Sequence, residues 1–256
     1  MTEDFLKFPH TPHLAWLGNQ SPRADKVLPP SEVADLLSDA VVVEEKVDGA
    51  NLGLSVGPDG LVRAQNRGNW LKRGSHAQFD AFWAWLDQWQ TDLSETLGDH
   101  LMLFGEWCLA VHSVRYNALP DWFLGFDVYD RSTGRFWDVL RRDALINDLG
   151  LAGVPRLAKG RFSVAELRNM LSQPSKLGGD SLEGIYIRAD ENGWLKARAK
   201  IVRFEFVQTI DEHWSRGPIK RNTVCSTQTE SRKACAMKKN DTYFLGAEKS
   251  SSESLP

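Results

Sequence analysis

Cysteine, long apolar runs and a strong net charge are all scarce in this chain of 256 residues. Its three cysteines, Cys108, Cys225 and Cys235, are odd in number, widely spaced and form no CxxC pair. This pattern argues against a disulfide framework and a zinc site, and it favours a reducing compartment. No apolar stretch is long enough to cross a bilayer, and the first residues contain no apolar signal segment. We therefore expect an intracellular, soluble protein, either cytoplasmic or nuclear.

Basic charge is local in this sequence. The net charge is −3, so the overall basic field of many nucleic-acid-binding proteins is missing. Two short stretches nevertheless carry four basic residues each and no acidic residue: Arg63, Arg67, Lys72 and Arg73, and then Lys196, Arg198, Lys200 and Arg203. Such a cluster suits either a solvated face or a phosphate-binding surface.

The pattern of apolar residues predicts an α+β fold. Strands are expected over 41–47, 50–56, 61–66, 101–107, 123–129, 184–189 and 194–207, with a hairpin turn at 57–60. Helices are expected over 32–37, 76–97, 138–149 and 164–172, the first capped by Ser31 and the last by a Ser163–Glu166 capping box. Because helices are scattered among the strands, antiparallel sheets flanked by helices are favoured.

Composition divides the chain into two parts. Residues 1–216 suit one large domain, and within it residues 1–30 are rich in Pro and His and are expected to wrap the surface in extended form. Residues 217–256 are polar, with few large apolar side chains, which predicts a flexible C-terminal tail.

Residues 44–51, EEKVDGAN, are the most informative stretch of the sequence. They place Lys46 after the apolar run 41–43 and just before an acidic residue, a glycine and an asparagine. An amine in this position can attack a phosphorus atom once its proton is removed and the phosphate charge is held. The alternative is an ordinary lysine on the surface of a strand.

Five more segments follow this stretch along the chain: 65–68 (QNRG), 103–107 (LFGEW), 123–129 (FLGFDVY), 182–187 (LEGIYI) and 196–200 (KARAK). With the pattern K-x-D-G at Lys46, they resemble the ordered motifs of the covalent nucleotidyltransferases, which are polynucleotide ligases and messenger-RNA capping enzymes. The K-x-x-G-x-N spacing to Asn51, the step of twenty residues from Glu106 to Phe126, and the segment 112–120 are similar to the phage type 2 branch of ATP-dependent RNA ligases.

This resemblance implies a nucleotidyltransferase fold of the ATP-grasp-like ligase type, as an adenylyltransferase domain over 1–216 with no OB domain after it. It implies an ATP-dependent RNA ligase that joins 5′-phosphate and 3′-hydroxyl RNA ends through a lysyl-AMP intermediate. ATP is then the AMP donor, Mg²⁺ or Mn²⁺ the metal, and RNA the partner. A second protein that supplies RNA binding is left open, because no further domain is predicted.

The resemblance also assigns roles to residues. Lys46 is the expected nucleophile. The expected nucleotide-binding residues are Glu45, Lys46, Asn51, Arg67, Glu106, Phe126, Arg198 and Lys200; the expected metal ligands are Glu183 and Asn51; and the expected RNA contacts are His112, Tyr116, Lys72 and Arg73. Arg198 stands where the family usually has a lysine.

Physical chemistry suggests how each group would act. Glu106 would accept hydrogen bonds from the ribose, and Phe126 would offer a flat face to the base. Arg198 and Lys200 would neutralise the α-phosphate and lower the pKa of Lys46. Each residue also has a structural interpretation, such as a core position for Phe126 or an exposed strand face for Arg198.

Three other functions remain open on the sequence alone. A capping-type guanylyltransferase and a DNA ligase use the same lysine chemistry, although both usually carry an additional barrel domain. A nucleotide- or RNA-binding module without turnover would keep the same pocket.

Overall fold

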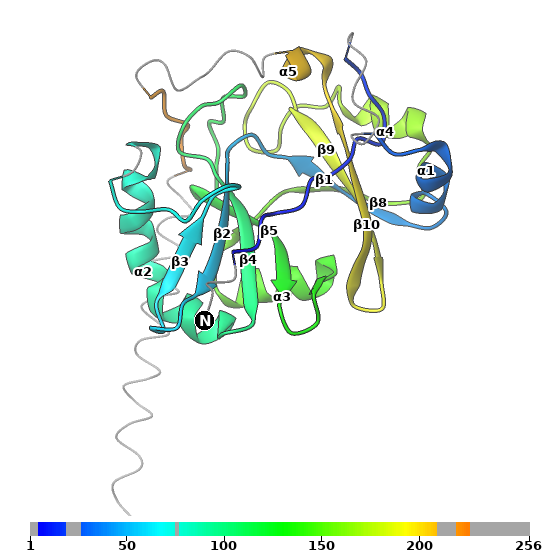
Figure 1. Ribbon diagram of the computed structural model, residues 1–256. Helices are drawn as coiled ribbons and strands as arrows, with labels where there is room; N and C mark the ends of the chain where they lie inside the picture. The colour runs from blue at the N-terminus through cyan, green and yellow to red at the C-terminus, as the bar shows by residue number, and fades with distance from the viewer. Residues whose placement is uncertain (1–4, 19–26, 75–76, 209–218, 226–256) are drawn as a thin grey trace, which may run out of the picture.

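Two β-sheets form the centre of the computed structural model, which describes residues 5–18, 27–74, 77–208 and 219–225 (Figure 1). The four-stranded sheet has the order β10 (Trp194–Val202), β9 (Gly184–Glu191), β1 (Val41–Lys46) and β8 (Arg156–Gly160). The six-stranded sheet has the order β3 (Val62–Gln65), β2 (Ala50–Val56), β4 (Leu101–Trp107), β5 (Phe123–Asp130) and β6 (Arg135–Phe136), with β7 (Ala152–Gly153) beside β5. All pairs are antiparallel except β5 with β7, so the expected α+β fold with antiparallel sheets is confirmed.

Helices flank these sheets. They are α1 (Pro30–Leu36), α2 (Asp80–Leu97) after a 3₁₀ turn at Ala77–Phe79, α3 (Val139–Asp148), α4 (Val164–Met170) and α5 (Phe204–Gln208). The Ser163–Glu166 capping box of α4 is confirmed. The expected Ser31 cap is wrong, because α1 begins one residue earlier at Pro30, whose fixed φ and missing N–H suit the first helical position. In the described part of the chain, no helix is long and apolar enough to cross a membrane.

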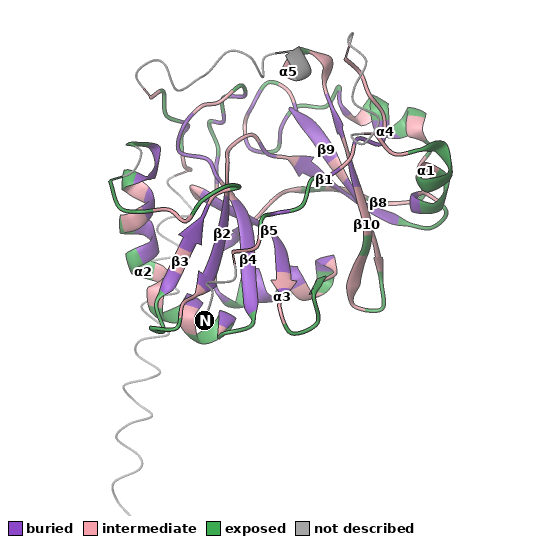
Figure 2. Cartoon of the chain, viewed as in Figure 1, coloured by how far each residue is buried: buried purple, intermediate pink, exposed green. Residues whose placement is uncertain are grey.

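The tryptophan-rich helix α2 packs its apolar face on the six-stranded sheet. Phe82, Leu86 and Leu93 are buried there; the burial of α2 is drawn in Figure 2. Trp85 is also buried and stacks near Phe82 with ring centroids 5.9 Å apart. The aromatic residues of α2 therefore serve packing. A second core lies between the four-stranded sheet and helices α1 and α4.

Some elements differ from the prediction. Strand β8 is missing from it, because the segment RLAKG shows neither an apolar run nor alternation. The strand expected over 194–207 ends at Val202, and α5 follows. At this point the N–H of Arg203 donates to the carbonyl of Glu183 at 2.9 Å, and the chain then turns into a helix.

Part of the expected C-terminal tail is packed against the domain. Asn222 is buried, and its side-chain amide donates to the carbonyls of Cys108, at 2.8 Å, and Ala110, at 3.2 Å. Its side-chain oxygen accepts from the N–H of Tyr116 at 2.8 Å. Residues 219–225 therefore do not behave as the flexible tail that their polar composition predicts. The rest of that segment lies outside the described residues.

Buried charges connect the two sheets. Arg142, on α3 beside β5, donates through both terminal nitrogens to the carboxylate of Glu44 on β1, at 3.1 and 2.5 Å. Arg188 on β9 donates to Asp127 on β5 at 2.5 Å. A buried charge that loses its partner is strongly destabilising. These pairs therefore hold the two sheets in one relative position.

Gly184 gives a test of the contact between β9 and β10. A Cβ atom here would lie 2.4 Å from the carbonyl oxygen of Ile201, which belongs to the backbone and has no rotamer to change. We predict that Gly184→Ala lowers the free energy of unfolding by about 1–3 kcal/mol, the usual cost of overpacking. Urea denaturation measures this. Gly68→Ala is the matched control, since a Cβ atom there would lie 3.9 Å from the nearest atom, the side-chain oxygen of Asn66; equal losses in the two variants would contradict the prediction.

Candidate active site

Lys46 lies where the chain passes from one sheet to the other. It is the last residue of β1, and β2 of the six-stranded sheet begins at Ala50. The connection runs close to β4, because a Cβ atom on Gly49 would lie 2.8 Å from the carbonyl oxygen of Trp107. Only glycine allows this close approach. The crossing places the lysine amine between the two sheets.

Lys46 forms an ion pair with Glu183. The register of β1 and β9 sets Lys46 opposite Gly184, and the lysine Nζ lies 2.5 Å from both carboxylate oxygens of Glu183. Burial by itself lowers the pKa of Lys46, but the negative charge of Glu183, aided by Tyr186 and Asp48, outweighs it and raises this pKa. The expectation of a lowered lysine pKa is therefore wrong for the ligand-free protein.

Acidic groups gather around the lysine. Burial raises the pKa of Glu106 to about 8; Lys46 and Arg67 oppose this shift, while Glu183 and Asp48 add to it. Burial likewise raises the pKa of Glu183 to about 7, against the pull of Lys46. One lysine thus faces three carboxyl groups, and a further cation bound among them would favour the ionised forms of Glu106 and Glu183.

Asn51 and Glu106 are paired across β2 and β4 and share an open cavity with Lys46. The Nδ2 atom of Asn51 and the Oε2 atom of Glu106 are buried and have no hydrogen-bond partner among the described residues. Buried polar atoms are normally paired, so two such atoms beside one cavity indicate a polar ligand.

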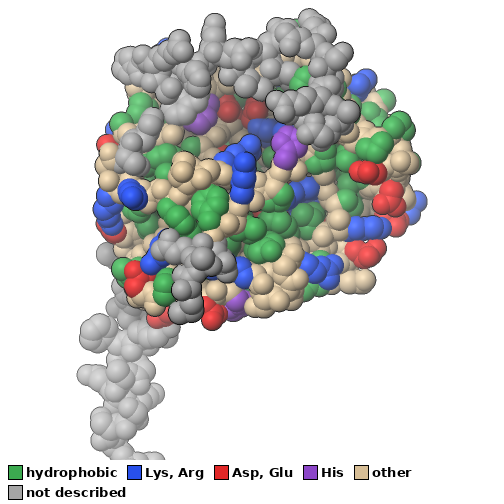
Figure 3. Space-filling view, in the orientation of Figure 1, with side chains coloured by type: hydrophobic (Ala, Val, Ile, Leu, Met, Phe, Trp, Pro, Cys, Tyr) green, Lys and Arg blue, Asp and Glu red, His purple; other side chains and the backbone are tan. Residues whose placement is uncertain are grey.

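The open cavity has a volume of about 510 Å³. Arg67 reaches it from a turn in which the Asn66 side chain accepts from the N–H groups of Gly68, at 2.9 Å, and Asn69, at 2.8 Å. The Arg67 side chain is exposed, so its guanidinium is available to an anion. On this face of the molecule, acidic side chains lie in a hollow with basic side chains beside them (Figure 3).

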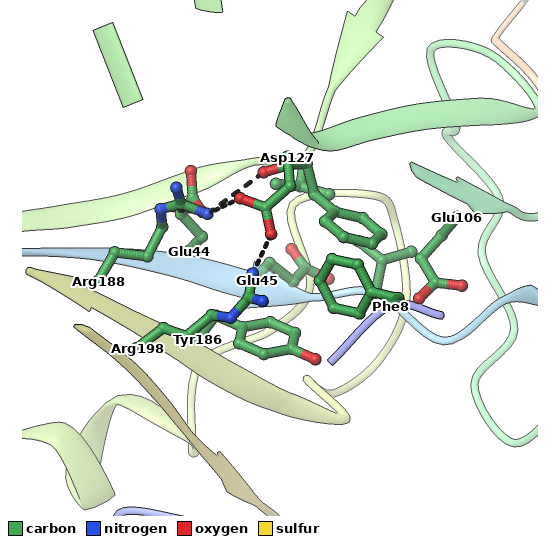
Figure 4. A pocket seen from close by; sticks show the side chains of 11 residues that line it. Phe8, Glu44, Glu45, Glu106, Asp127, Tyr186, Arg188 and Arg198 are labelled. Atoms are coloured by element: carbon green, nitrogen blue, oxygen red, sulfur yellow. Dashed lines mark hydrogen bonds and ion pairs between the residues drawn. The ribbon is translucent and has the colours of Figure 1, made fainter. Parts of the chain in front are cut away.

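A second cavity is narrow and lies against the first. It is lined by Phe126, Tyr186 and Arg198, and by Glu106, which also lines the open cavity (Figure 4). Its volume is about 20 Å³. Glu45 borders it too, with a carboxylate that accepts from the hydroxyl of Ser175 at 2.5 Å and from the N–H of Lys176 at 3.0 Å. This narrow cavity, the aromatic slot, thus shares lining residues with the polar cavity that Lys46 lines.

A comparison with protein families matches residues 39–202 to the family described as RNA ligase. This span is well over half of the chain and includes every strand of both sheets. The chain belongs to the RNA ligase family. The resemblance of its six motifs to this family is confirmed.

Solved structures with the same fold include RNA ligase from Naegleria gruberi. The chain is 18% identical to that ligase solved with pyrophosphate, with a TM-score of 0.56, over 70% of this chain and 54% of that chain. For a variant of the same ligase with ATP and manganese, the identity is 17% and the TM-score 0.52, over 67% of this chain and 51% of that one. This RNA ligase family member therefore spans about half the length of these structures. No curated protein sequence matches it.

Arg198, which the family motif leads one to expect at the α-phosphate, lines the narrow cavity. Its guanidinium donates to Asp127 and lies 4.5 Å from the ring centroids of both Phe8 and Phe136. Arg198 thereby forms part of the aromatic slot. Lys200, two residues later on β10, contributes positive charge at Glu183 instead. Arginine, with its planar head, suits stacking between two rings.

The four expected RNA contacts have different surroundings. His112 lines the open cavity. Tyr116 is fully buried, and its hydroxyl accepts from the N–H of Asp48 at 2.9 Å, so the expected RNA contact of Tyr116 is wrong. Lys72 is exposed, whereas Arg73 pairs with Asp87 at 2.5 Å. Asp48 itself accepts from two N–H groups in the segment after His112, and sequence reasoning gave it no such role.

The expected metal ligands were tested for their fit to a divalent cation. Glu183 offers two oxygen atoms, and Asn51 borders the neighbouring open cavity. In the described ranges, no three His, Cys, Asp or Glu side chains come close enough to hold a metal ion by themselves. Mg²⁺ commonly uses one or two carboxylates together with substrate phosphates and water. The residues present fit a cation of this kind.

Glu106 gives a pH test of the site. Its raised pKa means that the folded protein keeps a proton, from about pH 5 to about pH 8, that the unfolded chain has released. The free energy of unfolding therefore falls as pH rises through this window, by up to about 1.4 kcal/mol per pH unit for one proton.

Glu106→Gln mimics the neutral carboxyl group, so we predict a smaller pH slope of the unfolding free energy in this variant. Urea denaturation at several pH values measures the slope. The exposed Glu95→Gln on α2 is the control and should keep the parental slope. An unchanged slope in Glu106→Gln would show that this carboxyl group titrates normally.

Proposed function

We propose that this protein is an ATP-dependent RNA ligase that works through lysyl-AMP at Lys46. The observation that carries the proposal is the position of the Lys46 amine, which lies in the open polar cavity with the aromatic slot against it. A nucleotide has the same two parts, an aromatic base and a charged phosphate chain. The ligand of this site is therefore expected to be a nucleoside triphosphate, with its α-phosphorus near Nζ.

The roles of the residues follow from this placement. Phe126 and Tyr186 would stack on the base in the slot, and Glu106, which borders both cavities, would bind the ribose. Arg67 would bind phosphate in the open cavity, and Lys200 would add positive charge from β10. The ATP and manganese in the Naegleria structures support a nucleotide and a cation for this fold.

Lys46 must lose a proton, which water in the open cavity can accept, before it can attack. In the ligand-free protein its ion pair with Glu183 keeps it protonated. Glu183 would hold a divalent cation, Mg²⁺ or Mn²⁺, and the positive charge of that cation would weaken the ion pair with the ammonium and offset the phosphate charge. The neutral Nζ then forms a bond to the α-phosphorus, while the bond from that phosphorus to the bridging oxygen breaks and pyrophosphate leaves.

Two further steps complete the ligation. The lysyl-AMP transfers its AMP to the 5′-phosphate of one RNA end, which restores the Lys46 amine. The 3′-hydroxyl of the other end then attacks that phosphate, releases AMP and forms the phosphodiester bond. We place the adenylyltransferase domain over residues 1–216 together with the packed segment 219–225. A partner protein that supplies RNA binding also belongs to the proposal.

Incubation with α-³²P-labelled ATP and Mg²⁺ or Mn²⁺ tests the first step. We predict a covalent label on the wild-type protein and none on Lys46→Ala, because no other group replaces the amine. Lys196→Ala is the matched control: this lysine is exposed on β10 and pairs with Glu191, so its variant should label like the wild type.

Related measurements distinguish the alternative functions, which are a capping-type enzyme, a DNA ligase and a binding module without turnover. A label from GTP in preference to ATP would indicate a capping-type enzyme. ATP binding without pyrophosphate release would indicate a binding module and would contradict the proposal. Nicked duplex RNA, single-stranded RNA and nicked DNA with 5′-phosphate ends then identify the substrate joined by the labelled protein.

A further inference from the structure

An N-terminal strap, residues 5–14, crosses from one sheet to the other (Figure 1). Near its start, the side chain of Gln65 on β3 donates to the carbonyl of Leu6 at 2.7 Å. Near its end, the N–H of Lys200 on β10 donates to the carbonyl of Pro12 at 3.0 Å. The strap is therefore tied to both sheets, with the residues between these two hydrogen bonds spanning the gap.

Phe8 projects from the middle of this span into the wall of the aromatic slot (Figure 4). The side chain is only 6% exposed. Its ring centroid lies 5.2 Å from that of Phe126 in an edge-on arrangement and 4.9 Å from that of Phe104. The guanidinium of Arg198 covers it at 4.5 Å. Phe8 thus lines the slot together with residues of the strands.

The slot is too small for a base while Phe8 occupies this position. Its volume of about 20 Å³ holds about one water molecule. A purine, with two fused rings, requires several times that space. At least one wall must therefore move before a base can stack on Phe126.

Phe8 is the wall that can move at the lowest cost. The carbonyl of Phe126 is fixed by Arg142 at 2.7 Å and Arg188 at 3.4 Å. Tyr186 lies in the middle of β9, paired with β1 on one side and β10 on the other. Phe8, by contrast, belongs to no helix or strand, and the Pro9 after it has no backbone N–H to donate. Segments held by few backbone hydrogen bonds open most easily.

We propose that Phe8 is a gate of the base pocket. Its ring closes the slot in the nucleotide-free protein, and the strap between Leu6 and Pro12 shifts outward to admit the base. The inference rests on the proposed function, because it takes the ligand to be an adenine nucleotide. It makes the rate of nucleotide binding depend on the fraction of molecules in which the strap is open.

The association rate of a nucleotide tests the gate. The probe is α,β-methylene-ATP, which binds as ATP does but does not transfer AMP, with Mn²⁺ present and tryptophan fluorescence followed in a stopped-flow instrument. We predict that Phe8→Ala raises the association rate constant by about tenfold or more, because a minor open state is typically populated at 10% or less. Simple destabilisation of the fold would not speed up binding.

Two further variants serve as controls. Phe5→Ala removes the same ring from the same strap, but that ring packs edge-on against Trp70 outside the slot, so the parental rate is expected. Phe8→Leu keeps an apolar side chain against Phe104 and should give an intermediate rate, even if the alanine variant folds poorly.

An association rate in Phe8→Ala and Phe8→Leu equal to or below that of the wild type would overturn the gate and leave the proposed function intact. Failure of the wild type and all variants to bind the analogue at millimolar concentration would overturn both proposals.

Discussion

The ion pair between Lys46 and Glu183 is the interaction on which the candidate site depends. It forms because β1 and β9 are neighbours in register, with Lys46 opposite Gly184 and both carboxylate oxygens of Glu183 within 2.5 Å of Nζ. The pair keeps the lysine positioned but protonated, and therefore unreactive. Any chemistry at this amine must begin by separating the two charges. Under the proposed function, a cation that competes for Glu183 would separate them, and metal binding would then be linked to activation of the lysine.

The relative position of the two sheets determines where the aromatic slot lies with respect to the lysine. Arg142 contacts a strand of each sheet. It pairs with Glu44 on β1, two residues before Lys46, and donates to the carbonyl of Phe126 on β5. One buried side chain thereby connects the strand of the candidate nucleophile to the strand of the candidate stacking residue. The strap adds a movable wall to this rigid frame, since Phe8 packs on Phe104 and Phe126 but lies outside both sheets.

Local pattern predicts much of this fold, and contacts between distant segments account for what it misses. Strands β1, β2, β4 and β5 follow from short apolar stretches. The family motifs include Lys46, Asn51 and Glu106, which the structure brings together around one cavity, and Glu183, which pairs with Lys46. The pairing of Arg198 with Asp127 is not predictable in this way, because the two residues lie on different sheets. The position of Phe8 is not predictable from the sequence either, because its contacts are with distant segments and the residues around it show no periodicity. Residues 219–225 resemble a tail in composition, yet the Asn222 side chain matches three backbone groups, and backbone hydrogen bonds such as that from Thr223 to the carbonyl of Tyr116 also hold the segment.

Peptide mapping by mass spectrometry after incubation with ATP and Mn²⁺ tests the central claim most directly. The claim is that the amine between the two cavities is the group that becomes adenylylated. A mass gain of one AMP on the peptide that contains Lys46, with fragment ions that assign it to this side chain, is the predicted result. AMP on a different residue, or pyrophosphate release with no modified peptide, would contradict it.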